Sequence, residues 1–221
     1  MLDFATARRM MVDGQVRTAD VTDRAITQAM LDLPRERFVP DNPDLAYLDT
    51  DLPIGGSGQG LQRRLLKPMV LARMVQALDL SPEDRVLDVG CATGYAAALL
   101  SRLAAEVVAL EQDESLARQA ASQLANLRIT NVAVRTGPLV QGFAEAAPYN
   151  AILVEGGVDI QPQNLCSQLA DGGRLVCIHR ATAAPKAVIF RRDQDDITAR
   201  PLFEASAAVL PGFSRAPAFE F

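Results

Sequence analysis

The residues best placed for chemistry lie in the segment VLDVGCATGY, residues 86–95, where a short apolar run leads into a loop with two glycines. Gly90 and Gly94 allow the backbone to turn sharply and to approach a ligand closely. Asp88 places a negative charge beside the loop. Glu111 ends the next apolar run, where a carboxylate accepts hydrogen bonds from ribose hydroxyls in nucleotide-binding α/β folds.

This pattern discriminates between nucleotide ligands. The loop lacks the third glycine that admits a pyrophosphate in dinucleotide-binding folds, and it lacks the GK[ST] of a Walker loop. The charge of Asp88 would repel a phosphate but favour a cationic amino-acid group. An adenosine that carries a methionine therefore fits better than NAD or ATP. The alternative is a purely structural strand–turn–helix with an incidental pair of glycines.

The elements that must position this loop alternate in type. Five short apolar runs predict strands, namely residues 84–90, 106–111, 131–137, 149–156 and 172–179. Helical patterns separate them at about residues 95–103, 114–127 and 161–170. Such alternation predicts an α/β, Rossmann-like fold with a mostly parallel central sheet and helices on both faces. The segments KAVIFRRD and ITARPLFEAS predict a C-terminal β-hairpin at the edge of that sheet.

The N-terminal part of the chain reads differently. Apolar spacing predicts a helix over residues 3–17 and another that starts after Thr22 as N-cap and ends before Pro34. A loop rich in Pro, Gly and Asp follows, and an amphipathic helix runs over residues 68–80. We expect an N-terminal helical and substrate-lip region at 1–80 and a Rossmann-like core at 81–221.

Composition excludes several classes of protein. The 221 residues carry a net charge of −5 with a pI near 5, so the basic surplus of a nucleic-acid-binding protein is lacking. Three scattered cysteines and one histidine argue against a structural zinc site or a disulfide framework, and we expect no bound metal. We see no signal peptide and no membrane-spanning run, so we expect a cytoplasmic protein. The oligomeric state is not set by the sequence.

Several motifs together resemble those of the protein-L-isoaspartate O-methyltransferases. The resemblance runs from about residue 21 to residue 179. It rests on RERFVP (35–40), LAYLDTDLPIG (45–55), VLDVGCATGY (86–95), NVAVRTG (131–137) and a run that starts with APYNAILV (147–154). It implies an enzyme of protein repair that methylates the isoaspartyl carboxylate of a damaged protein or peptide, with S-adenosyl-L-methionine as the cofactor. The cofactor-binding residues we expect are Asp88, Gly90, Ala92, Gly94, Tyr95, Glu111, Gln112, Gly137 and Glu155.

The implied reaction suits a chain with one histidine. A carboxylate is already an anionic nucleophile at neutral pH, so methylating it needs no general base and no metal. Positioning and desolvation are sufficient.

The substrate loop departs from the family pattern. The family loop reads like GxGxTISQP, whereas this chain has GGSGQGLQRRLLKP (55–68), which puts Arg64, Leu65 and Leu66 where the family has Thr, Ile and Ser. Ser57 or Gln59 would have to replace the lost hydroxyl contacts, and we expect Ser57, Gln59, Arg64 and Leu66 to be the catalytic residues. The basic residues at 63, 64 and 67 either attract a carboxylate or form a solvated turn.

Two further departures affect the cofactor. Pro138 follows Gly137 where the family has an acid that reaches the adenine amine, and proline offers neither that acceptor nor an N–H. Glu155 follows the fourth strand where the family is usually small and apolar with a threonine. It either meets the cation of the cofactor, repels the acceptor carboxylate, or is a solvated loop acid.

These departures leave two rival functions open. One is a methyltransferase with a different small-molecule or protein acceptor. The other is a binding or assembly subunit that has lost catalysis. A nucleic-acid methyltransferase is more distant, because no [ND]PP[YF] follows the fourth strand.

Overall fold

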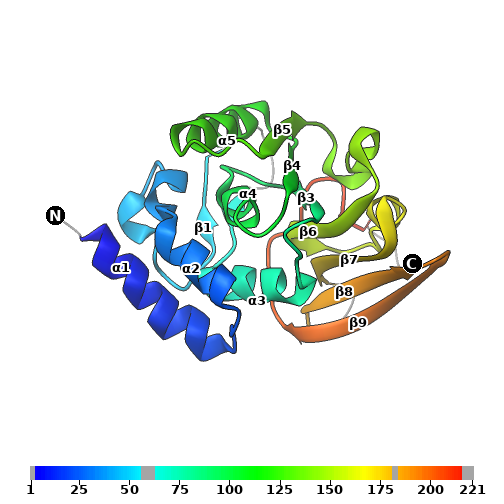
Figure 1. Ribbon diagram of the computed structural model, residues 1–221, viewed down its shortest axis with the longest axis horizontal. Coiled ribbons are helices and arrows are strands. Elements are labelled where there is room, and N and C mark those ends of the chain that lie inside the picture. The colour runs from blue at the N-terminus through cyan, green and yellow to red at the C-terminus, as the bar shows by residue number, and fades with distance from the viewer. Residues whose placement is uncertain (1–2, 56–62, 181–183, 216–221) are drawn as a thin grey trace, which may run out of the picture.

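The computed structural model describes residues 3–55, 63–180 and 184–215, which form a central sheet with helices packed on it (Figure 1). The seven strands lie in the order β5-β4-β3-β6-β7-β8-β9. Five of them are parallel: β3 (Arg85–Val89), β4 (Glu106–Glu111), β5 (Val132–Thr136), β6 (Tyr149–Val158) and β7 (Leu169–His179). The antiparallel strands β8 (Lys186–Asp193) and β9 (Asp196–Glu204) complete one edge as the expected hairpin.

The helices of the N-terminal part are α1 (Phe4–Met11), α2 (Arg24–Asp32) and α3 (Pro68–Leu78). The core contributes α4 (Tyr95–Leu100), α5 (Glu114–Asn126) and the single turn α6 (Gln163–Cys166). A π-helical segment, Val12–Val16, and a 3-10 turn, Arg17–Ala19, extend α1, and two short strands, β1 (Leu52–Pro53) and β2 (Arg64–Leu65), pair apart from the main sheet. None of the helices in the described ranges has the length and apolar character needed to cross a membrane.

The two faces of the sheet are covered unequally. Residues alternate along each strand, so Val86 joins a buried cluster with α1–α4 on one face and Leu87 joins a second cluster on the other. The second face is covered by α6, by 3-10 turns and by the segment 209–213. The Rossmann-like fold expected from the sequence is thus confirmed, with most of the helical cover on one side.

Side chains from the N-terminal helices and from the sheet share the first cluster. It includes Met11 before the π-helical segment, Met74 on α3 and Val176 in the sheet. Burial of this apolar surface stabilises the N-terminal helices against the sheet. The division at residue 80 stays a prediction.

Among the predicted boundaries that differ from the structure, two have identifiable reasons. The helix expected over 161–170 is only one turn long, because Leu169 already pairs with Tyr149 as the start of β7. The N-cap of α2 is Asp23 rather than Thr22, because the carboxylate of Asp23 accepts from the N–H groups of Ala25 and Ile26.

Candidate active site

The glycine turn after β3 is held by the neighbouring strand β4. The N–H groups of Gly90 and Cys91 both donate to the carbonyl of Leu110, at 2.8 and 3.1 Å. Gly90 has φ +82°, a conformation that side chains disfavour, and a Cβ there would lie 2.8 Å from Nη2 of Arg63 and 3.2 Å from Leu210. The positive φ therefore favours glycine at this position, and the side chains of Arg63 and Leu210 pack against it.

The second glycine brings two helices together. Gly94 precedes α4 with φ +93°, and a Cβ there would lie 3.1 Å from the Cβ and 3.3 Å from the Cα of Ala120 on α5. Asp113 caps α5 by accepting from the N–H groups of Ser115 and Leu116. The close packing of α5 on the turn, together with this cap, positions the start of α5 beside Glu111.

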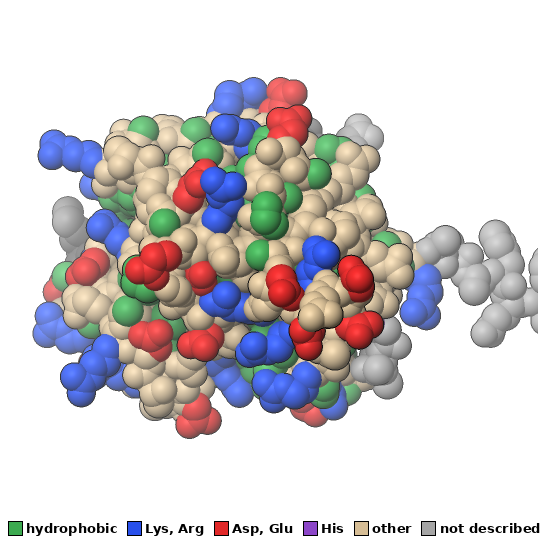
Figure 2. All heavy atoms as spheres, turned by 45° about the vertical axis from the view of Figure 1, so that its right-hand side comes forward, with side chains coloured by type: hydrophobic (Ala, Val, Ile, Leu, Met, Phe, Trp, Pro, Cys, Tyr) green, Lys and Arg blue, Asp and Glu red, His purple; other side chains and the backbone are tan. Residues whose placement is uncertain are grey.

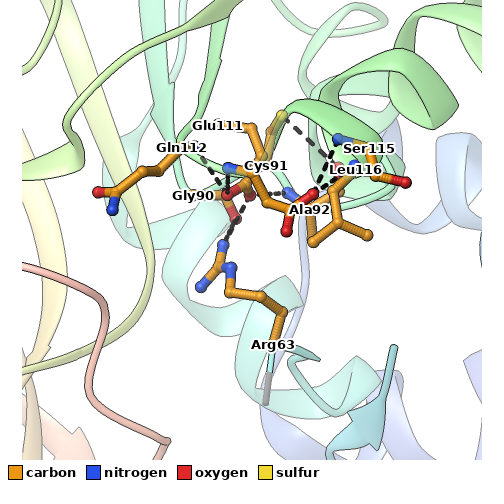
Figure 3. Close-up of polar contacts among 9 residues, drawn as sticks. Arg63, Gly90, Cys91, Ala92, Glu111, Gln112, Ser115 and Leu116 are labelled. Carbon is orange, nitrogen blue, oxygen red and sulfur yellow. Dashed lines mark hydrogen bonds and ion pairs between the residues drawn. The ribbon is translucent and has the colours of Figure 1, made fainter. Parts of the chain in front are cut away.

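Glu111 ends β4, and its carboxylate faces the glycine turn (Figure 3). One oxygen, Oε1, accepts from the N–H groups of Gln112 and Asp113 at 2.8 and 3.1 Å. The other, Oε2, accepts from the N–H of Ala92 at 2.8 Å. The backbone of the turn and of the start of α5 thus orients this buried acid.

The remaining hydrogen-bond donor to Glu111 is an arginine that the sequence analysis did not connect with it. Nη2 of Arg63 donates to Oε2 of Glu111 at 2.8 Å and to the carbonyl of Gly90 at 2.7 Å, as Figure 3 shows. The Arg63 side chain is 8% exposed and that of Glu111 is 1% exposed. The basic character of 63–67 was the only signal for this contact, because nothing in the sequence indicates which acid a loop arginine will meet.

Two further acids meet beneath the turn. Asp88 and Glu155 are both buried, and no described donor reaches either oxygen of Asp88 or Oε1 of Glu155. Burial raises the pKa of Asp88 to about 7. Burial, followed by the charge of Asp88, raises the pKa of Glu155 well above its usual range. The two carboxyl groups are hydrogen-bonding partners when a proton lies between them, so burial and their mutual repulsion favour a protonated form of the pair.

Tyr95 follows the glycine turn, but its ring contacts the N-terminal part of the chain and not Glu111. Its ring packs edge-on against Phe38 with centroids 5.5 Å apart, and the guanidinium of Arg35 lies 4.5 Å from its centroid. Arg35 is fully buried and donates to the carbonyls of Ala46 and Leu66. The RERFVP segment thereby fixes the backbone at residues 46 and 66.

The expected catalytic residues are only partly placed. Ser57 and Gln59 lie outside the described residues. Arg64, in β2, donates to the carbonyl of Asp51 at 3.2 Å, and the Leu66 side chain belongs to the buried core. Their catalytic roles stay predictions.

The remaining cofactor candidates lie along the edge of the sheet beyond β4 and β5. Gln112 is exposed beside Glu111, and the N–H of Gly137 donates to the carbonyl of Glu111 at 3.1 Å. Pro138 is exposed and starts a 3-10 turn, Leu139–Gln141. The backbone therefore holds Gly137 next to Glu111, as a cofactor contact would require.

The segment 207–210, near the C-terminus, lies beside β6 and borders the site. Gly157 donates its N–H to the carbonyl of Ala208 and accepts from the N–H of Leu210, which extends the sheet by one bridge. The Leu210 side chain lies where a Cβ at Gly90 or at Gly156 would be. Between this segment, the lip and Glu155 lies a hollow of about 10 Å³, which is about the space of one water.

Comparison with known proteins places this geometry in a family. A family model of the protein-L-isoaspartate (D-aspartate) O-methyltransferases matches residues 7–206. A protein-L-isoaspartate O-methyltransferase of Roseiflexus is 40% identical over 212 residues, 96% of this chain and 94% of the relative. One from Pelotomaculum thermopropionicum is 44% identical over 173 residues, 78% of this chain and 73% of the relative.

The chain belongs to the protein-L-isoaspartate (D-aspartate) O-methyltransferase family. A solved protein-L-isoaspartate O-methyltransferase superposes on it with a TM-score of 0.82 at 26% identity; the match covers 93% of this chain and 66% of that chain. A Plasmodium falciparum protein of the same description, solved in complex with S-adenosyl-L-homocysteine, shares the fold with a TM-score of 0.78 at 19% identity.

Membership confirms the resemblance read from the motifs, the enzyme class and S-adenosyl-L-methionine as the methyl donor. The residues around the glycine turn fit this donor in two respects. Glu111 is aimed at the turn, and the buried carboxyl groups of Asp88 and Glu155 offer negative charge to a cationic group. They oppose it in one respect, because Arg63 already occupies Oε2 of Glu111.

Proposed function

We propose that this chain transfers a methyl group from S-adenosyl-L-methionine to the isoaspartyl carboxylate of damaged proteins or peptides. The observation that carries the proposal is the position of Glu111. Its buried carboxylate ends β4 and faces a glycine turn shaped for close approach, in a chain that matches the repair methyltransferases over most of its length.

Each residue of the turn has a distinct task in this proposal. S-adenosylmethionine, when bound, supplies a methyl group activated by a positively charged sulfur. Glu111 accepts hydrogen bonds from the ribose hydroxyls, and Gly90, which has no side chain, lets the ligand approach the backbone. Asp88 and Glu155 supply the negative charge that a cationic ligand requires. An acceptor carboxylate is ionised at neutral pH, so these residues need not remove a proton from it.

The departures from the family pattern within residues 55–68, the lip of the site, affect which methyl acceptor can bind. Arg63 and Arg64 border the hollow beside Glu155, and both guanidinium groups have the fork geometry that binds carboxylates. In this chain, positive charge at the lip thus replaces the hydroxyl groups expected from the family pattern.

Transfer of radiolabelled methyl groups tests the proposal. Two peptides of the same sequence are compared, one with isoaspartate and one with aspartate at a single position. We expect base-labile label on the isoaspartyl peptide alone. Label on neither peptide, from a protein that binds S-adenosylhomocysteine, would eliminate the repair activity and leave a methyltransferase with another acceptor.

A binding subunit without catalysis is the second candidate, and the ion pair between Arg63 and Glu111 favours it. Isothermal calorimetry with S-adenosylhomocysteine separates the two. Measurable binding supports an enzyme, whereas a complete lack of binding in the wild type and in variants of Arg63 supports the subunit.

We also propose a cytoplasmic setting and a protein rather than a nucleic-acid partner. The three cysteines, Cys91, Cys166 and Cys177, are buried and unpaired, as is usual in a reducing compartment. On the face shown in Figure 2, acidic and basic side chains are interspersed, and no continuous basic area is visible there.

A further inference from the structure

The lone pairs of Glu111 are fully used. A carboxylate has about four acceptor positions, two on each oxygen. Oε1 accepts from two backbone N–H groups, and Oε2 accepts from the N–H of Ala92 and from Nη2 of Arg63. A ribose that binds Glu111 must therefore displace a donor.

Only one of the four donors is free to leave. Three are backbone groups, held by the glycine turn and by the capped start of α5. Arg63 reaches Glu111 with a flexible side chain, and its Nε has no acceptor among the described residues. Its second acceptor, the carbonyl of Gly90, belongs to the same turn. The guanidinium thus lies at the point on Glu111 that ribose hydroxyls would occupy.

Charge balance explains why Arg63 remains buried in the free protein. Asp88, Glu111 and Glu155 are three buried carboxyl groups, and Arg63 is the cation that the described structure pairs with Glu111. Its charge also favours the ionised forms of Asp88 and Glu155 and so acts to lower their pKa values. A buried acid that loses its cation is strongly destabilised, so Arg63 leaves readily only when another cation arrives. The cofactor provides one in the α-ammonium of its amino-acid part, which S-adenosylhomocysteine shares, in addition to the sulfonium of S-adenosylmethionine.

We propose that Arg63 exchanges partners during the reaction: it holds Glu111 in the free protein and is released to the acceptor carboxylate when the cofactor binds. The release of Arg63 to an acceptor carboxylate rests on the proposed function. Arg63 borders the small hollow next to Arg64, Leu66 and Glu155, on the side of the lip. A guanidinium released there faces a carboxylate acceptor, with which it forms charge-assisted hydrogen bonds.

This exchange makes two quantities measurable. Arg63 competes with the cofactor, so its removal tightens cofactor binding. Arg63 also links the two ligands, because an acceptor carboxylate that holds it away from Glu111 favours the cofactor. By linkage, the cofactor strengthens acceptor binding by the same factor.

Calorimetry with S-adenosylhomocysteine and Arg63→Met tests the competition without any turnover. Methionine keeps much of the length and apolar surface but has no donor. We expect affinity to rise by about 10- to 100-fold, the range for loss of one competing charge-assisted hydrogen bond. Arg118→Met removes the same charge from an exposed ion pair on α5 and should change the affinity by less than about twofold. Unchanged or weaker binding by Arg63→Met overturns the proposal.

A second variant guards against misfolding of the first. Arg63→Lys keeps the cation but loses the fork geometry, and it should give an intermediate gain in affinity. Loss of Arg63 destabilises the free protein in either case, whereas a merely structural role for Arg63 would weaken ligand binding in both variants.

The link to the acceptor is measured by repeating the titrations with saturating isoaspartyl peptide. We expect the peptide to tighten S-adenosylhomocysteine binding in the wild type and to have no such effect in Arg63→Met, while the aspartyl peptide has none in either. If the isoaspartyl peptide does not change S-adenosylhomocysteine binding in the wild type, the proposed release of Arg63 to the acceptor is overturned. If the repair activity itself is wrong, peptide methylation fails while Arg63→Met still tightens the cofactor analogue, so the two failures are distinguishable.

Discussion

Replacing Glu155 by glutamine tests the electrostatics beneath the glycine turn. Glu155 and Asp88 are buried together, and no described donor reaches three of their four oxygens. Glutamine keeps the size of the side chain, removes one ionisable group and donates a hydrogen bond to Asp88. We expect Glu155→Gln to stabilise the protein at neutral and alkaline pH.

The sign and size of the effect follow from the raised pKa values. An unfolded Asp or Glu ionises near pH 4, whereas burial raises the pKa of Asp88 from 3.8 to about 7 in the folded protein. A carboxyl group with a raised folded pKa binds its proton more tightly in the folded state. Its contribution to stability is full below about pH 4 and is lost as the pH rises through the folded pKa.

The shift for Asp88 alone corresponds to about 4 kcal/mol, at about 1.4 kcal/mol per pH unit. The two groups titrate as a pair, so their shifts must not be added. Glu155→Gln also removes an attraction to Arg63. We therefore expect a net gain of roughly 2–3 kcal/mol at pH 8, or roughly 5–10 °C in Tm for a chain of this size.

Thermal unfolding between pH 5 and pH 8 measures this gain. The wild type should lose stability across that range, and Glu155→Gln should show a flatter profile. Glu114→Gln is the matched control, because its side chain is 75% exposed in a helical ion pair, and it should shift Tm by only about 1 °C. Parallel profiles for the wild type and Glu155→Gln would refute the buried pair as the source of the pH dependence.

Three further outcomes test the packing of the site. Gly94→Ala should destabilise by roughly 2–4 kcal/mol in urea unfolding, because it adds contact with the backbone of Ala120 to the strain of a positive φ; Gly172→Ala, with a positive φ but open space, should cost only about 1–2 kcal/mol. Arg35→Met should destabilise by roughly 2–3 kcal/mol, because two buried carbonyls lose their donor; a smaller change would show that water replaces it. Cys91 should resist alkylation at pH 8 until the protein unfolds, because burial raises the pKa of its thiol; rapid labelling of the native protein would contradict that burial.

The strands were predictable because their apolar runs are short and bounded by polar residues. The run 106–111 matches β4 at both ends, and the run 84–90 exceeds β3 by one residue on each side. The pattern at 161–170 misled, since it carries apolar residues that suit either a helix or a strand. The pairing of Leu169 with Tyr149 decides for the strand, and pairing with a distant strand cannot be read from a local pattern.

The site was predictable where strand ends determine it. In a parallel sheet the carboxyl ends of neighbouring strands lie together, so Gly90 and Glu111 had to meet once β3 and β4 were adjacent. Tyr95 was harder, because it starts a helix and can face either the ligand or the N-terminal helices. Its contacts with Phe38 and Arg35 depend on a segment that lies outside the predicted core and far from Tyr95 in the sequence.

Two departures from the family pattern look independent in the sequence but meet in the structure. One is the arginine-containing lip, and the other is Glu155 after the fourth strand. Asp88 pairs with Leu153 in the register of β3 and β6, so Glu155, two residues further, lies on the same face and next to Asp88. A third buried acid increases the need for a cation, and Arg63 is near enough that its charge favours the ionised forms of both acids. The extra acid and the arginine therefore compensate each other. Removing Arg63 alone should destabilise the free protein more than removing it together with Glu155, since in the double variant fewer buried charges are left unpaired.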